Sequence, residues 1–312
     1  MALTPGVPIA TGGSGWSRES ELQVEEPVFR PDDTIRRNWN ASVPIVIDGS
    51  GRSRESEHQI NEPAFRPDDT IGRSQNTGIA AWTAALGAIP DAVWPRLLDL
   101  LDTTERDRAA RFVFERHRRQ HIAAHALKRL MLSAVGGAPP RSWTFEAVAG
   151  GKPRVGPGPG PHFNISHCDG LVACAISDDL ELGVDVEPVG RKAPLHLART
   201  YFAPEEERWL ASLPAAEQPL GFFRLWTLKE AYIKATGLGL AQPLHDFAFA
   251  FDPLRVLFHD PTLGDPRLWR FEQRLVGEHL LALAWRGDGR SRSVDFREVS
   301  LETLLSDASI GV

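Results

Sequence analysis

The segment FRLWTLKEAYIKATG (223–237) has the periodicity of an amphipathic helix, but it carries charged residues very close to its apolar stripe. Trp226, Glu230 and Ile233 fall at positions i, i+4 and i+7, so the Glu230 carboxylate shares a helix face with the tryptophan. Lys234 follows Glu230 by four residues, and an exposed ion pair is one interpretation of that spacing. Beside a large indole, however, a carboxylate is partly buried and needs a cationic partner. The segment therefore predicts a helix that carries part of a charged site.

Composition limits the class of protein. The chain has 312 residues, of which 42% are hydrophobic and 24% charged, as in a soluble globular protein. Its net charge of −6 does not predict a nucleic-acid binder. No apolar run approaches the roughly 18 residues of a membrane span, and the N-terminus lacks the pattern of a signal peptide. We expect a cytoplasmic monomer that has neither nucleic acid nor membrane as a partner, with Cys168 and Cys174 as small core residues.

Residues 1–76 contain a near-duplication, in which residues 14–37 return as residues 50–73. Two copies are too few for a solenoid, which needs about three repeats. The segment is rich in Pro, Ser, Arg and acidic residues and has only isolated apolar residues, so we expect a mostly disordered extension.

From residue 77 onward the pattern is that of an α+β protein in two similar lobes, residues 77–187 and 188–312. Asp178-Asp179 predicts a hairpin between the last two strands of the first lobe. Thr103 or Thr104 is the expected N-cap of a helix, whole or broken, that ends at Gly136-Gly137. The Gly/Pro-rich stretch 150–162 predicts a loop without regular structure. The expected strands are near 78–86, 142–148, 171–177, 181–187, 246–252, 268–274 and 279–286, and the other expected helices near 93–101, 193–200, 204–213 and 217–236.

The stretch LGVDVEP (182–188) places Asp185 and Glu187 two residues apart on a predicted strand, so both carboxylates leave the same face. Two like charges this close repel each other unless a cation lies between them. A solvated strand end is the simpler interpretation. Oxygen ligands of this kind also suit Mg²⁺, which keeps several waters and bridges phosphate oxygens.

Two further segments could contact an anionic ligand. FNISHCDG (163–170) offers Ser166 and His167 at the end of the Gly/Pro loop, either as structural hydrogen-bonding residues or as donors to a phosphate. No G-x-S-x-G elbow accompanies them, so a serine-hydrolase triad is poorly supported. The arginine-rich stretch 106–121 fits a solvated helix face, a clamp for one charged ligand group or, less well, a nucleic-acid surface.

Four motifs in order, GKP (151–153), FNISH (163–167), GVDVE (183–187) and WTLKEAYIK (226–234), resemble the 4′-phosphopantetheinyl transferases of the Sfp type. The likeness covers roughly residues 77–300. Trp226 and the alanine after Lys-Glu resemble the branch that serves peptide and polyketide synthases. The resemblance implies two pseudo-symmetric lobes, each a small, mainly antiparallel sheet packed against helices, with coenzyme A between them.

The resemblance also implies a reaction and a set of roles. Phosphopantetheine passes from coenzyme A to a serine of an acyl or peptidyl carrier protein and leaves adenosine 3′,5′-bisphosphate. The implied Mg²⁺ ligands are Asp185, Glu187 and Glu230. Glu230 also helps to deprotonate the serine, and Lys234, with Lys229 as its neighbour, stabilises the pyrophosphate charge. The implied coenzyme A contacts are Arg108, Arg111, Lys152, Pro153, Ser166 and His167, with the two arginines assigned to the 3′-phosphate by position alone.

The competing interpretation is a degenerate member that binds carrier domains or coenzyme A without turnover. The presence of all three carboxylates and of Lys234 favours the enzyme. Which carrier is modified, and whether Mg²⁺ or Mn²⁺ is preferred, does not follow from the motifs.

Overall fold

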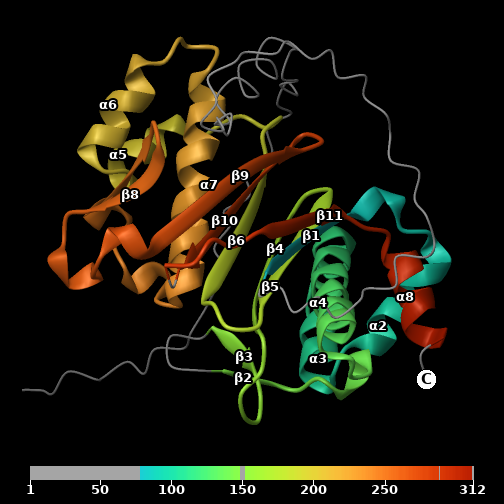
Figure 1. Cartoon of the computed structure of the whole chain (residues 1–312). Coiled ribbons are helices and arrows are strands. Elements are labelled where there is room, and N and C mark those ends of the chain that lie inside the picture. Colours follow the sequence, from blue (N-terminus) through green and yellow to red (C-terminus); the bar gives the residue numbers. More distant parts are fainter. Residues whose placement is uncertain (1–77, 148–151, 288, 311–312) are drawn as a thin grey trace, which may run out of the picture.

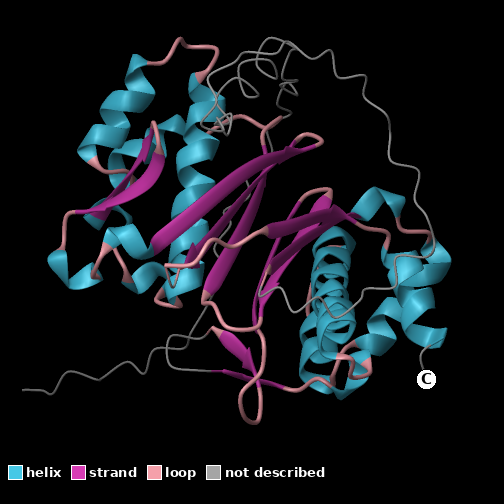
Figure 2. Cartoon of the chain, in the orientation of Figure 1, coloured by secondary structure: helices cyan, strands magenta, loops and turns pink. Residues whose placement is uncertain are grey.

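The computed structural model describes residues 78–147, 152–287 and 289–310. The predicted disordered extension and its near-duplication lie outside the described residues. The described chain is a mixed α+β protein with small, largely antiparallel sheets between two groups of helices (Figures 1 and 2).

Two sheets form the centre of the molecule. The first has the strand order β11-β1-β5-β4 and the second has the order β6-β10-β9, while β2-β3 and β7-β8 are separate two-stranded ribbons. All neighbouring pairs are antiparallel except β1 and β11, which are parallel. The strands are β1 Ile79–Ala85, β2 Phe145–Ala147, β3 Pro153–Val155, β4 His162–Cys168, β5 Leu171–Ser177, β6 Leu182–Pro188, β7 Phe247–Phe251, β8 Leu254–Phe258, β9 Trp269–Val276, β10 His279–Arg286 and β11 Val294–Glu298.

One long helix covers each sheet (Figure 1). Helix α4 packs on the first sheet and α7 on the second, and the shorter helices surround them. Both long helices end at a glycine with positive φ, Gly137 and Gly237, where an L side chain would be strained. The helices are α2 Trp94–Leu100, α3 Thr103–Ala110, α4 Glu115–Gly136, α5 Ala198–Tyr201, α6 Pro204–Ser212, α7 Gln218–Thr236 and α8 Leu301–Ile310.

The two sheets meet where β4 lies beside β6. Apolar side chains of β1, β5, β6 and β10 form one buried cluster between them. The Val184 N–H donates to Asn164 Oδ1 at 2.9 Å, and the Val186 N–H lies 3.3 Å from Ser166 Oγ. Polar side chains of β4 therefore occupy backbone donors of β6 that no neighbouring strand pairs with on that side.

The predicted hairpin between 171–177 and 181–187 is wrong. Strand β5 has β1 on one edge and β4 on the other, so neither edge is free for β6, which pairs with β10 instead. The segment FNISHC, assigned from sequence to the end of a loop, is the strand β4, and it forms the hairpin with β5 through Asp169-Gly170. Gly170 takes φ +88° in that turn, a conformation that favours glycine.

Several smaller expectations also change. The N-cap of α3 is Asp102, not Thr103 or Thr104, and it forms a capping box with Glu105. The predicted loop 150–162 contains β3, which pairs with β2. The last part of the chain packs on the first lobe and not on the second. Strand β11 pairs with β1, and Leu301 and Leu305 of α8 join the core of the first lobe.

The two long helices, α4 and α7, both contain several charged residues. Neither these nor the other described helices have a stretch both long and apolar enough to cross a membrane.

Candidate active site

Strand β6 holds Asp185 and Glu187 against helix α7. Gly183 makes this contact possible, because a Cβ at that position would lie 2.2 Å from the Ala231 carbonyl oxygen and 2.4 Å from the Ala235 nitrogen. Val184 and Val186 fill the cluster between the sheets, so the two acidic side chains leave the other face of the strand, as their spacing predicted. Asp185 is buried and Glu187 is half-buried.

Asp185, Lys234 and Ser166 form one hydrogen-bonded group from three elements. The Lys234 ammonium donates to Asp185 Oδ1 at 2.6 Å and to Ser166 Oγ at 3.0 Å, and the Ser166 hydroxyl donates to the same Asp185 oxygen at 2.9 Å. Asp185 Oδ2 is buried and has no hydrogen-bond partner among the described residues. One oxygen of the central carboxylate is thus fully used, while the other is available to a ligand.

Glu230 and Glu187 are the two other carboxylates near this group. Glu187 accepts from the Arg191 guanidinium at 2.7 Å, whereas Glu230 makes no hydrogen bond or ion pair with a described residue. Burial and the Asp185 charge raise the pKa of both groups to about 7. Burial alone would lower the pKa of Lys234, but Asp185 and Glu230 outweigh it and raise that pKa. Negative charge is therefore in excess here.

The donor set suits a hard divalent cation, although it is not gathered around one point. Among the residues that the structure describes, no three His, Cys, Asp or Glu side chains lie close enough to form a ready metal site. The three carboxylates nevertheless supply only oxygen ligands, and one of these oxygens, Asp185 Oδ2, is buried without a hydrogen-bond partner. The charges of Glu187 and Glu230 repel that of Asp185, so a cation among them would be stabilised. In chemistry, these residues fit Mg²⁺.

His167 and Arg108 lie on the side of this group that faces α3 and α4. Desolvation and the positive charges of Lys234, His121 and Arg108 lower the pKa of His167 to about 4. The His121 ring nitrogen lies 2.9 Å from the Glu105 carbonyl oxygen. Arg108 is exposed and belongs to this positive neighbourhood, whereas nothing links the exposed Arg111 to it. Of the two arginines predicted from sequence, the structure brings Arg108 close.

Lys152 reaches from the loop before β3 to the C-terminal end of α7. Its ammonium donates to the Leu182 carbonyl at 2.8 Å and to the Ala235 carbonyl at 3.0 Å, and burial lowers its pKa to about 8. Pro153 begins β3 and is exposed. Lys152 therefore links β6 to the end of helix α7 through backbone carbonyls.

Lys229 lies elsewhere, which corrects its predicted place beside the pyrophosphate. Its side chain is fully buried and pairs with Glu206 at 2.8 Å. The ammonium also donates to the Leu244 and Phe247 carbonyls, at 2.7 Å each. It points away from Glu230 and Lys234, because one step along a helix turns the side-chain direction by about 100° and five steps turn it by about 140°.

A second buried ionic network was not predicted. Glu105 Oε1 accepts from Lys128 at 2.5 Å and contacts His125 Nδ1 at 2.8 Å, while Glu105 Oε2 accepts from Arg129 at 2.8 Å. This network fixes α3 on α4 and thereby sets the positions of Arg108 and His121. In the sequence, the capping-box pattern of residues 102–105 was the one feature that could have predicted a special position for Glu105.

Two family models match this chain. The model of the 4′-phosphopantetheinyl transferase superfamily matches residues 181–284, which include β6 and α7. The model described as 4′-phosphopantetheinyl transferase, N-terminal, matches residues 89–178. The two matches adjoin at the turn between β5 and β6.

Three curated relatives carry the same activity in their names. The 4′-phosphopantetheinyl transferase HetI of Nostoc sp. is 36% identical over 168 residues, which are 53% of this chain and 70% of the relative. The psf-1 transferase of Bacillus pumilus is 36% identical over 46% of this chain and 60% of its own. The human L-aminoadipate-semialdehyde dehydrogenase-phosphopantetheinyl transferase is 28% identical, with 65% and 73% covered. The chain therefore belongs to the 4′-phosphopantetheinyl transferase superfamily and is an enzyme that transfers phosphopantetheine.

Proposed function

We propose that this enzyme transfers the 4′-phosphopantetheine group of coenzyme A to a serine of an acyl or peptidyl carrier protein in a Mg²⁺-dependent reaction. The observation that carries the proposal is the group of Asp185, Lys234 and Ser166, with the unpartnered Glu230 beside it. A compact cation, a carboxylate with one free oxygen and a second free carboxylate together suit phosphoryl transfer, in which positioning and electrostatic stabilisation supply most of the catalysis.

The transfer exchanges one phosphorus–oxygen bond for another. The carrier serine oxygen bonds to the phosphorus next to pantetheine, and the bond from that phosphorus to the bridging pyrophosphate oxygen breaks. Adenosine 3′,5′-bisphosphate leaves with the bond electrons, and the serine proton passes to Glu230, directly or through water. Lys234 stabilises the negative charge that develops on the leaving oxygen, because its ammonium lies between Asp185 and Ser166.

Asp185, Glu187 and Glu230 would hold the divalent cation. The free Asp185 Oδ2 is the atom that most needs such a partner. The bound cation would neutralise charge on the pyrophosphate oxygens. Before it binds, Lys234 serves as the counterion of Asp185.

The coenzyme A contacts follow the positive neighbourhood around His167. His167 would donate to a phosphate oxygen, Ser166 would do so by turning its hydroxyl away from Asp185, and Arg108 would contribute charge at the 3′-phosphate. The backbone around Lys152 and Pro153 would border the adenine. Lys229 is not included, because Glu206 and two carbonyls occupy its ammonium.

The identity of the carrier rests on the tryptophan and alanine of the α7 motif. Trp226 stacks on Phe222, with ring centroids 5.8 Å apart, and Ala231 is buried against β6. We infer a monomeric cytoplasmic enzyme that serves carrier domains of peptide or polyketide synthases, with neither nucleic acid nor membrane as a partner.

Intact-protein mass spectrometry tests the proposal. Several apo carrier proteins are incubated with the enzyme, coenzyme A and Mg²⁺, and each is weighed. A gain equal to one phosphopantetheine group on at least one carrier is expected, and chelation of the metal should abolish it. No gain on any carrier, with coenzyme A binding retained, would favour the degenerate binding protein.

A further inference from the structure

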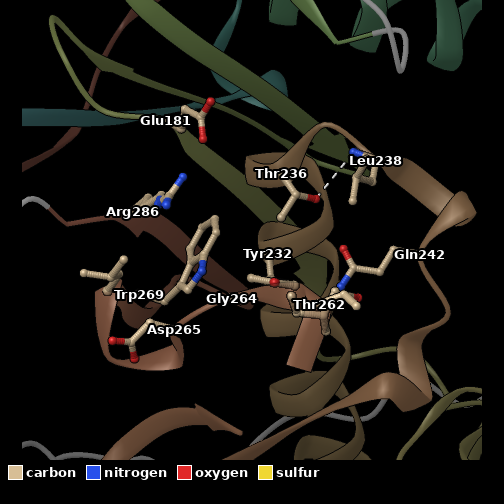
Figure 3. A pocket seen from close by; sticks show the side chains of 12 residues that line it. Glu181, Tyr232, Thr236, Leu238, Gln242, Thr262, Gly264, Asp265, Trp269 and Arg286 are labelled. Atoms are coloured by element: carbon tan, nitrogen blue, oxygen red, sulfur yellow. Dashed lines mark hydrogen bonds between the residues drawn. The ribbon is translucent and has the colours of Figure 1, made fainter. Parts of the chain in front are cut away.

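A pocket of about 370 Å³ lies at the C-terminal end of α7 (Figure 3). Tyr232 and Thr236 line it, and each follows a residue of the active site, Glu230 or Lys234, by two positions. Two positions on an α-helix correspond to about 200° of rotation, so the pocket and the active site face opposite directions. Its volume is in the range of small-molecule sites.

An aromatic wall forms one side of the pocket. The Trp269 indole stands at the centre of Figure 3 and packs edge-on against Tyr232, with the ring centroids 4.7 Å apart. Trp269 is only half-buried, unlike Tyr232, which is almost fully covered. A half-buried indole beside a hollow offers a surface on which a planar ring can stack.

Gln242 is a buried amide whose hydrogen-bonding capacity is poorly used. Its side chain is 4% exposed, and neither its amide nitrogen nor its amide oxygen forms a hydrogen bond of standard geometry, although the Tyr232 hydroxyl is a near neighbour. Figure 3 shows the amide turned toward Tyr232 and Thr262. A buried polar group without a partner costs about 1–3 kcal/mol, and a ligand that offered one donor and one acceptor would remove this cost.

Charge at the rim suggests what the rest of such a ligand carries. The guanidinium of Arg286 and the carboxylate of Glu181 line the pocket on the side opposite Gln242 (Figure 3). Neither side chain has a hydrogen-bond or ion-pair partner among the described residues, and their link is through backbone, from the Arg286 N–H to the Glu181 carbonyl. A free guanidinium suits a phosphate, and a free carboxylate suits sugar hydroxyls.

We propose that this pocket is a second ligand site, distinct from the active site, that binds a purine mononucleotide. The base stacks on Trp269, and its edge meets the Gln242 amide, which pairs with the donor and acceptor of an adenine. Glu181 receives the ribose hydroxyls, and Arg286 binds the phosphate. The site does not depend on the proposed carrier chemistry, because none of these residues belongs to the transfer machinery.

Isothermal titration of the full chain with adenosine monophosphate tests the site. One mononucleotide per chain should bind, and Arg286→Gln should weaken binding at least tenfold. Gln242→Leu should have a similar effect, provided that its thermal melt matches that of the wild type. Arg255→Gln, an exposed arginine on β8 of the same lobe, is the matched control and should bind normally.

A variant of the active site distinguishes the two places where a nucleotide could bind. Arg108→Gln, which alters the proposed 3′-phosphate contact of coenzyme A, should leave binding of adenosine monophosphate unchanged. The proposal is overturned if binding is lost in Arg108→Gln but kept in Arg286→Gln, because the nucleotide then occupies the active site. It is also overturned if the wild type shows no binding up to millimolar nucleotide, a concentration that detects affinities as weak as about 4 kcal/mol.

Discussion

The buried ion pair of Lys229 and Glu206 tests whether Lys229 stabilises the fold and does not contact coenzyme A. Lys229→Met keeps the length and the apolar stem of the side chain but removes its charge. It would leave the Glu206 carboxylate fully buried without its cation and the Leu244 and Phe247 carbonyls without their donor. Glu206 would retain only the Ala203 and Phe249 N–H groups as donors.

The expected loss is large because the pair is fully desolvated. Breaking a buried ion pair by removing one partner costs about 3–5 kcal/mol. Much of a typical domain stability of roughly 5–15 kcal/mol would be lost. Urea unfolding followed by circular dichroism measures it, with the exposed Lys192→Met as the matched control, for which we expect a change within about 0.5 kcal/mol.

A double variant separates the pair from its surroundings. Lys229→Met combined with Glu206→Gln should cost less than the sum of the two single changes, because the buried charge that the first change orphans is no longer present. The reasoning is refuted if Lys229→Met unfolds like the wild type but binds coenzyme A at least tenfold more weakly. That outcome would return Lys229 to the pyrophosphate.

Three further predictions follow from the site and the core. Lys234→Arg should lower phosphopantetheine transfer at least tenfold, about 1.4 kcal/mol, because a guanidinium is wider than the ammonium held between Asp185 and Ser166; near-normal steady-state rates would contradict this. Gly183→Ala should prevent stable folding, because its Cβ would lie 2.2 Å from the Ala231 carbonyl oxygen of α7. Gly87→Ala is the control and should melt like the wild type, because no atom lies within 4 Å of the added Cβ. Equal melting temperatures of the two variants would refute the close contact. Desolvation lowers the pKa of His125 to about 4, below its unfolded value near 6.5, so its contribution to stability is complete above pH 6.5 and is lost as the pH falls toward 4. Urea titrations should therefore show that the His125→Gln variant loses less stability than the wild type between pH 6.5 and 4. An unchanged pH dependence in the variant would contradict this prediction.

Local patterns in the sequence predicted local structure well. The period of residues 223–237 identified α7, and the two-residue spacing of Asp185 and Glu187 put both side chains on one face of β6. The glycine pair at positions 136 and 137 marked the end of α4. These features depend on neighbours within a few residues, which is why a single sequence contains them.

Long-range pairing could not be predicted in the same way. Asp178-Asp179 has the composition of a hairpin turn, yet the chain crosses from one sheet to the other there, because β4 and β1 already occupy both edges of β5. The return of β11 to β1 joins residues more than 200 positions apart. No local pattern records which edge remains free.

For charged residues too, the sequence predicts local features and does not predict long-range partners. Lys229 and Lys234 lie in one motif, but the sequence does not reveal that Glu206, 23 positions before Lys229, faces the first and Asp185 the second. Burial of Glu105 among Lys128, Arg129 and His125 likewise depends on the packing of α3 on α4. Residue type identified the candidates, and tertiary contacts show which of them are buried in ion pairs and which lie in the candidate site.

A titration with Mn²⁺ in the presence of coenzyme A, followed by electron paramagnetic resonance, tests most directly whether Asp185, Glu187 and Glu230 share one divalent cation. We predict one tightly bound Mn²⁺ per chain, at least tenfold weaker binding in Asp185→Asn and Glu230→Gln, and normal binding in Glu302→Gln, an exposed glutamate of α8. Unchanged Mn²⁺ affinity in Glu230→Gln would contradict the account, because the helix would then contribute no ligand to the metal.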